Sequence, residues 1–211
     1  MSKRIPWPAL RRSLVAILRG LKPEEAESVV GGLIEAGFEA IEIPLNSPDP
    51  FNSIERAARL APASCLIGAG TVLSVADVDR LAGAGGRLMV SPNVNPAVIG
   101  RASDAGMVTL PGVFTPTEAL MATEAGASGL KFFPASVLGP SGISAIRAVL
   151  PPAIELGVVG GISDVSFAEY AKVGVRTFGL GSSLYKPGDS GADVVRKGRA
   201  ATEAYDRAFD A

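Results

Sequence analysis

Histidine is absent from the 211-residue sequence, and no other feature of the composition excludes as much chemistry. Without an imidazole, the chain can form no Ser-His-Asp triad, no Cys-His dyad and no metal centre with histidine ligands. Proton transfer in an active site of this chain must therefore use a carboxylate, a lysine, a tyrosine, a cysteine or water.

Cysteine and long apolar runs are also scarce. Cys65 is the only cysteine, so no disulfide can form within the chain and no zinc site with paired cysteines is predicted. Residues 1–8 lack the long apolar stretch of a signal peptide, and no later segment reaches the apolar length of a membrane span. These absences predict a soluble protein of the reducing cytoplasm.

Neither sign of charge dominates. The sequence has 20 lysines and arginines against 21 acidic residues, which gives a net charge of −1. This balance offers no electrostatic reason to expect nucleic acid or an anionic membrane as a partner. A hydrophobic content of 47% is typical of a compact, aliphatic-rich α/β protein.

Short apolar strands alternate with amphipathic helices along the chain. Eight such pairs predict an α/β fold of the (β/α)8 TIM barrel type, formed by residues 1–211 as a single domain. A doubly wound open sheet is the alternative, but it usually has a glycine-rich turn after its first strand, where this chain has Arg19-Gly20-Leu21. The expected strands are residues 13–18, 40–43, 64–69, 87–90, 107–110, 129–134, 154–159 and 176–180.

Three local features refine this prediction. Residues 1–12 form an N-terminal lead-in, with a helix expected over residues 8–12. Ser74 has the position and side chain of a helix N-cap. The helix after the sixth strand is expected over residues 142–150.

A lysine interrupts the apolar run of residues 129–134. Lys131 lies between Leu130 and Phe132, in a strand expected to be buried on both faces. Burial disfavours the ammonium form, so the pKa of Lys131 should fall, and a neutral amine is a nucleophile toward carbonyl groups. Alternatively, the ammonium group reaches a strand end or pairs with a buried carboxylate.

Other polar residues fall at or near the carboxyl ends of the expected strands, where TIM barrels place their reacting groups. Glu42 lies between two isoleucines, so burial should raise its pKa toward the range useful for proton transfer; alternatively, it neutralises Lys131. Arg19 has a planar fork suited to a carboxylate, or is an ordinary surface arginine. Thr71 has a hydroxyl and an N–H for the same anion, or is an ordinary turn residue.

Glycine-rich turns follow the last two expected strands. They are Gly160-Gly161-Ile162-Ser163 and Gly179-Leu180-Gly181-Ser182-Ser183. Glycine lets the backbone approach an anion closely, helix N-termini present free N–H groups, and these two loops are where TIM barrels bind phosphate. Alternatively, both segments are only tight strand-to-helix turns.

Taken together, these motifs resemble the class I KDPG/KDPGal aldolase family, whose members cleave 2-keto-3-deoxy-6-phospho sugar acids. The resemblance covers nearly the whole chain in order. The matching segments are residues 16–20, 42–48, 68–73, 91–93, Pro111-Gly112, 130–134, 159–161 and Gly181-Ser182.

The resemblance implies a Schiff base between Lys131 and the keto group of the substrate, with Glu42 moving protons. It implies that Arg19 and Thr71 hold the substrate carboxylate, and that the phosphate is held by Gly161, Gly181 and Ser182. It further implies release of pyruvate and glyceraldehyde 3-phosphate, no metal or other cofactor, and a homotrimer.

The resemblance also bears on the choice between two epimeric substrates. The gluconate-type members look to have a threonine before the Gly-Gly pair and a Thr-Leu-Arg-Thr-like segment after the glutamate. This chain has Val159 and Pro44-Leu45-Asn46-Ser47-Pro48 there, which is similar to the galactonate type. We therefore expect the substrate to be 2-dehydro-3-deoxy-6-phosphogalactonate, with the gluconate epimer as the alternative.

Two other functions fit the same scaffold. One is a phosphate-binding barrel isomerase or lyase that uses Glu42 as its sole base, with Lys131 as an electrostatic partner. The other is a sugar-phosphate sensor without catalysis. The combination of a lysine, a glutamate and an arginine at one barrel mouth argues against this function.

Overall fold

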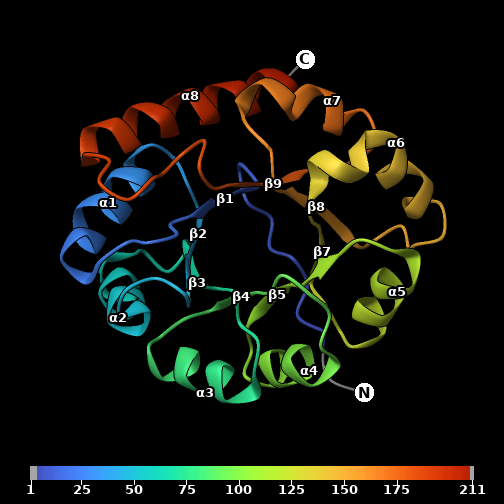
Figure 1. The fold of residues 1–211 in the computed structure, drawn as a ribbon, viewed down its shortest axis with the longest axis horizontal. Helices are drawn as coiled ribbons and strands as arrows, with labels where there is room; N and C mark the ends of the chain where they lie inside the picture. Colours follow the sequence, from blue (N-terminus) through green and yellow to red (C-terminus); the bar gives the residue numbers. More distant parts are fainter. Residues whose placement is uncertain (1–3, 210–211) are drawn as a thin grey trace.

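The computed structural model describes residues 4–209, and within them a ring of parallel strands surrounds the centre of the molecule (Figure 1). The strand order β5-β4-β3-β2-β1-β9-β8-β7-β6 follows the chain around the ring. The strands are β1 (Leu14–Ile17), β2 (Ala40–Pro44), β3 (Leu66–Gly70), β4 (Leu88–Val90), β5 (Val108–Leu110), β6 (Gly112–Val113), β7 (Gly129–Phe132), β8 (Glu155–Val159) and β9 (Thr177–Leu180).

Strands β5 and β6 are two pieces of the fifth barrel strand. Pro111, which has no N–H to donate, divides them, and β5 pairs with β4 while β6 pairs with β7. The carbonyl of Pro111 accepts a hydrogen bond from the N–H of Lys131 at 2.9 Å, so the ring continues through the break. The predicted (β/α)8 barrel is confirmed, and the open sheet is excluded because the strand order has no reversal.

Helices surround this ring on the outside (Figure 1). Proline at the first turn starts several of them, where its missing N–H is not needed. Ser74 caps α3 as predicted, since its hydroxyl accepts from the N–H of Asp77 at 3.1 Å. The helices are α1 (Pro23–Glu35), α2 (Pro50–Leu60), α3 (Val75–Gly83), α4 (Pro96–Asp104), α5 (Pro116–Glu124), α6 (Ala135–Arg147), the 3-10 helix η1 (Asp164–Ser166), α7 (Phe167–Ala171) and α8 (Gly191–Phe209).

The strands divide their side chains between two cores. Alternate residues such as Leu130 and Phe132 pack outward against the helices. The residues between them point into the barrel, and those of β1 to β5 form a second cluster. The members of this inner cluster are Val15, Ala40, Leu66, Leu88, Val90, Val108 and Leu110, and Ile5, Trp7 and Leu10 pack against it.

The lead-in differs from the prediction. The helix expected over residues 8–12 is wrong, because residues 4–13 contain neither helix nor strand. Pro6 and Pro8 lack the N–H groups that a helix uses. The segment instead lays Trp7 and Leu10 against the inner cluster, so it closes the amino end of the barrel.

Helix α6 also differs from the prediction. It begins at Ala135, directly after β7, and ends at Arg147, whereas residues 142–150 were expected. Gly139 has φ 68° and Pro140 follows it, so two helical segments join across a kink. The expected helix therefore corresponds to the segment after this kink, and the helical turn before it was not predicted.

No helix within residues 4–209 combines the length and the apolar character needed to cross a membrane.

Substitution of Gly68 tests whether the fold requires the close approach of strands β3 and β4. A Cβ atom there would collide with the carbonyl of Leu88, whereas a Cβ on Gly83 in α3 would meet open space. We expect Gly68→Ala to lower the free energy of unfolding by about 1–3 kcal/mol and Gly83→Ala to leave it unchanged or raise it by up to about 1 kcal/mol. Urea unfolding of both variants measures this, and equal stabilities would contradict it.

Candidate active site

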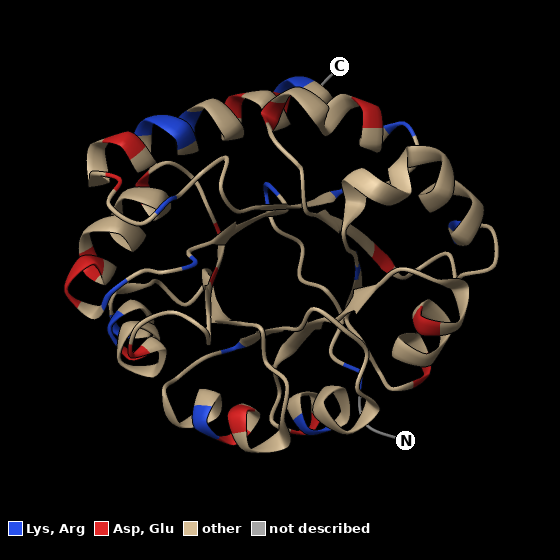
Figure 2. Cartoon of the chain, in the orientation of Figure 1, with Lys and Arg blue, Asp and Glu red and all other residues tan. Residues whose placement is uncertain are grey.

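Two ionisable side chains of opposite charge point into the barrel. Glu42 on β2 is 3% exposed and Lys131 on β7 is 6% exposed. Each lies between outward-facing apolar neighbours, so strand alternation turns it inward. Most other acidic and basic residues lie on the outer helices and loops (Figure 2), which leaves this pair as the charged feature of the interior.

Glycines lie beside both side chains in the neighbouring strands. Lys131 is in register with Gly112 on β6 and Gly157 on β8, and Glu42 is in register with Gly68 on β3. A Cβ atom on Gly112 would meet the backbone of Pro92, and one on Gly68 would meet the backbone of Leu88. Glycine therefore lets the chain pack closely beside the lysine and the glutamate.

Gly70 is required by Glu42 more directly. A Cβ atom on Gly70 would overlap the Glu42 carboxylate, and the N–H of Gly70 donates a hydrogen bond to that carboxylate. The Oε2 atom of Glu42 is buried and has no hydrogen-bond partner within the described chain. An unpartnered buried carboxylate oxygen is costly, and it is available to accept a proton, or a hydrogen bond from a hydroxyl group.

Burial shifts both groups toward neutrality. It raises the pKa of Glu42 to about 7, although the charges of Lys131 and Arg19 and the Gly70 hydrogen bond oppose this. Burial lowers the pKa of Lys131 to about 8; the Glu42 carboxylate opposes this effect, and the charge of Arg19 adds to it. Near neutral pH the pair can therefore exchange protons with a substrate at low cost.

Phe133 lies beside the lysine and was not singled out in the sequence. The Nζ atom of Lys131 is 5.1 Å from the centre of the Phe133 ring, a distance at which an aromatic face stabilises a cation. Phe133 also lines a cavity of about 290 Å³ with Asn93 and Phe114. In the sequence it was part of the apolar run of residues 129–134 and of the matching segment 130–134, but it had no role of its own.

Arg19 follows β1 and reaches the same mouth. Its Nη1 atom donates to the Oδ1 atom of Asn46, and its charge acts on both Glu42 and Lys131. The N–H of Gly20 donates to the hydroxyl of Ser47 at 2.9 Å, so the segments after β1 and β2 are joined. Sequence reasoning did not find this contact, because it links residues 27 positions apart.

Thr71 directly follows β3 and has φ 58°. A positive φ is strained for a β-branched residue, and such strain is more frequent at functional sites than elsewhere. The residue is half-buried at the mouth of the barrel, where its hydroxyl and N–H were expected to meet an anion.

The two glycine-rich turns lie side by side after β8 and β9. Gly160 and Gly161 have φ 93° and 76°, values that favour glycine. The hydroxyl of Ser183 donates to the carbonyl of Ile162 at 3.0 Å and joins the turns. A Cβ on Gly181 would meet no atom within 4 Å, and Ser182 is exposed, so this backbone is open to a ligand.

Two further residues flank these turns. Val159 is the last residue of β8 and is half-buried; a Cβ on Gly179 would collide with it. Ser136, which the sequence did not indicate, is the second residue of α6, and its N–H donates to the carbonyl of Gly160 at 3.0 Å. A side chain at Gly161 would meet the hydroxyl of Ser136, so this hydroxyl lies over the turn.

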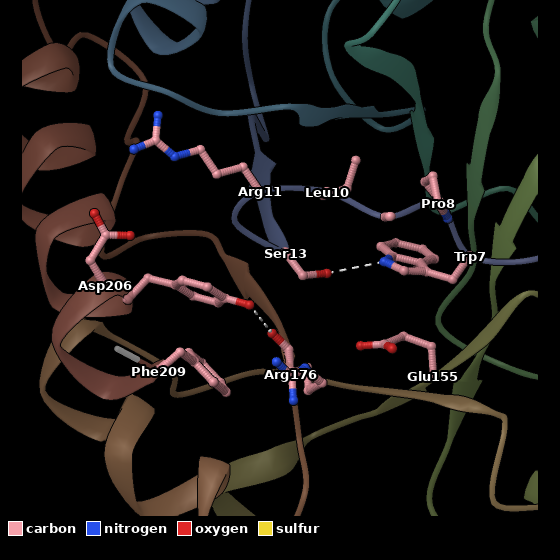
Figure 3. A pocket seen from close by; sticks show the side chains of 11 residues that line it. Trp7, Pro8, Leu10, Arg11, Ser13, Glu155, Arg176, Asp206 and Phe209 are labelled. Carbon is pink, nitrogen blue, oxygen red and sulfur yellow. Dashed lines mark hydrogen bonds between the residues drawn. The ribbon is translucent and has the colours of Figure 1, made fainter. Parts of the chain in front are cut away.

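A second polar cavity of about 290 Å³ lies at the opposite, amino end of the barrel (Figure 3). The Nε1 atom of Trp7 donates to Ser13 at 3.0 Å, Ser13 contacts Thr177, and Thr177 donates to Glu155 at 2.7 Å. The amino end of a TIM barrel contributes to stability rather than catalysis. We assign this hydrogen-bond chain to closing the barrel.

Comparison with known proteins identifies the family. The family model "Aldolase: KDPG and KHG aldolase" matches residues 9–196. A Rhizobium meliloti (strain 1021) protein named probable 2-dehydro-3-deoxy-6-phosphogalactonate aldolase is 70% identical over 206 residues, which cover 98% of this chain and 97% of that protein.

Two further comparisons agree. The 2-dehydro-3-deoxy-6-phosphogalactonate aldolase of Escherichia coli (strain K12) is 46% identical over 192 residues, which cover 91% of this chain and 94% of that protein. A solved structure described as native KDPGal superposes with a TM-score of 0.95 at 44% identity, and covers 98% of this chain and 100% of its own.

The raised pKa of Glu42 can be measured directly. We expect the ¹³C chemical shift of its carboxyl carbon to titrate with a midpoint of about 7. Lys131→Met should raise the midpoint further, because it removes a positive charge that favours the carboxylate. Lys172→Met, at an exposed lysine, should leave it unchanged. A wild-type midpoint near the ordinary value of 4.5 would show that Glu42 is solvated.

Proposed function

The chain belongs to the KDPG and KHG aldolase family, and we propose that it cleaves 2-dehydro-3-deoxy-6-phosphogalactonate to pyruvate and glyceraldehyde 3-phosphate. The observation that supports the chemistry most directly is the buried pair of Lys131 and Glu42. The names of the 70% and 46% identical relatives support the choice of substrate.

The reaction begins at the Lys131 amine. Because burial lowers its pKa, part of the amine is neutral near pH 7 and attacks the C2 ketone of the substrate. A carbinolamine forms and loses water, which leaves a protonated imine between Nζ and C2. The Phe133 ring stabilises this cation as it stabilises the ammonium group.

Glu42 moves the protons. Its ionised carboxylate takes the proton of the C4 hydroxyl, the bond between C3 and C4 breaks, and the electron pair moves into the imine to form an enamine. C4 becomes the aldehyde carbon of glyceraldehyde 3-phosphate. Glu42 then returns a proton to C3, and water hydrolyses the resulting imine to release pyruvate and the free amine. A pKa of about 7 suits both directions of transfer.

The two ends of the substrate are anionic and need separate sites. Arg19 and Thr71 hold the carboxylate beside the imine, because the guanidinium fork matches a carboxylate. Gly161, Gly181 and Ser182 hold the phosphate with backbone N–H groups and a hydroxyl. The open backbone at Gly181 supports this assignment.

We also propose a homotrimer that works in the cytoplasm. The resemblance to the aldolase family supports the trimer, and exposed apolar side chains on and near α5, such as Phe114, Leu120 and Met121, provide surface for it. A single buried cysteine is compatible with a reducing compartment.

Trapping tests the nucleophile. With pyruvate and borohydride, the wild-type chain should gain a stable mass adduct at Lys131, and Lys131→Ala should lose both the adduct and substrate cleavage. Glu42→Gln is the comparison variant: it should still form some adduct but turn over roughly 10²–10⁴-fold more slowly. Cleavage without any adduct would instead favour an isomerase or lyase that uses Glu42 as its sole base.

The epimer preference is tested by assaying both phosphorylated sugar acids side by side. We expect a higher kcat/KM for the galactonate epimer, and Val159→Thr should shift the ratio toward the gluconate epimer by roughly 10–100-fold at most, since one side chain contributes only a few kcal/mol. Val159→Ala separates the effect of the hydroxyl from that of size. A wild-type preference for the gluconate epimer would contradict the proposed substrate.

A further inference from the structure

Arg19 is exposed, and its side chain has one hydrogen-bond partner within residues 4–209. Its Nη1 atom donates to Oδ1 of Asn46, and no carboxylate within the described chain forms an ion pair with it. An exposed arginine without a partner samples many rotamers, and fixing it costs entropy. The contact with Asn46 therefore decides where this guanidinium lies before a ligand arrives.

The segment that presents Asn46 is anchored on both sides. Before it, the N–H of Leu45 donates to the carbonyl of Gly70 at 2.8 Å; after it, the N–H of Ser47 donates to the carbonyl of Pro44 at 2.9 Å. The hydroxyl of buried Ser47 also accepts from Gly20, which directly follows Arg19. Asn46 is thus held at a fixed place relative to the backbone of Arg19.

The chemistry of this acceptor matters as much as its position. An amide oxygen accepts a hydrogen bond from a guanidinium but has no net charge, so Arg19 keeps its full positive charge. A carboxylate in the same place would accept the hydrogen bond and neutralise the arginine. A neutral acceptor therefore orients Arg19 without competing with an anionic ligand for the positive charge of the arginine.

On the basis of the function proposed above, we propose that Asn46 is a positioning residue that aims Arg19 at the substrate carboxylate and, because it is uncharged, leaves that arginine free to bind it. Asn46 does not touch the reacting atoms. Its effect is on the binding of the carboxylate and passes through Arg19.

The test compares two ketones in the borohydride trapping reaction. Pyruvate has the carboxylate, and pyruvamide replaces it with a neutral amide of similar shape. Asn46→Asp keeps a hydrogen-bond acceptor but adds a charge, so we expect the half-saturating pyruvate concentration to rise about tenfold or more. Asn46→Ala should raise it by about threefold. For pyruvamide both variants should stay within about twofold of wild type.

A matched control adds the same charge elsewhere on the rim. Asn95 caps α4 by accepting from the N–H of Ala97, and α4 lies across the barrel from β1 (Figure 1). Aspartate caps as well as asparagine, so Asn95→Asp should leave both half-saturating concentrations unchanged. In an Arg19→Ala background, Asn46→Asp should have no further effect on pyruvate.

The outcomes separate the two proposals. Equal losses with pyruvate and pyruvamide, or the same loss in the Arg19→Ala background, would overturn the role of Asn46 and leave the aldolase mechanism intact. Absence of any pyruvate adduct on the wild-type chain would overturn both, because Arg19 would then have no carboxylate to bind.

Discussion

The structure depends on keeping a carboxylate and an amine together inside the barrel, where both are buried. Burial disfavours the charged form of each group, while the attraction between the opposite charges favours it. The balance leaves Glu42 and Lys131 with pKa values of about 7 and about 8. A chain without histidine has in this way two groups that titrate near neutral pH.

Glycine makes this arrangement possible in a small barrel. Valine, leucine and alanine of β1 to β5 form an apolar cluster inside the ring, as in an ordinary packed core. Beside Lys131 the neighbouring strands instead have Gly112 and Gly157. The interior is therefore lined by apolar side chains on one group of strands and by glycine on the two strands that flank the lysine.

Periodicity predicted most of this fold, because a strand alternates its side chains between two faces. If Leu130 and Phe132 face the outer helices, this alternation turns Lys131 toward the inside of the barrel. It does not predict the lead-in, where prolines replace a helix with an extended plug, or the helical turn before Gly139. Nor does it predict that Asn46 meets Arg19, because a contact between loops depends on the lateral order of strands, which no local pattern records.

The plug formed by residues 4–13 has a consequence for the order of events. Because Trp7 and Leu10 pack against the inner cluster, this segment covers the amino end of the barrel, and the proposed site opens at the other end. In the mechanism proposed above, the phosphorylated half of the sugar acid lies toward this open end, while the other half stays bound to the lysine. In that mechanism the aldehyde departs first and the keto acid last, so an enzyme loaded with keto acid alone is ready to run the reaction backward with the next aldehyde that arrives.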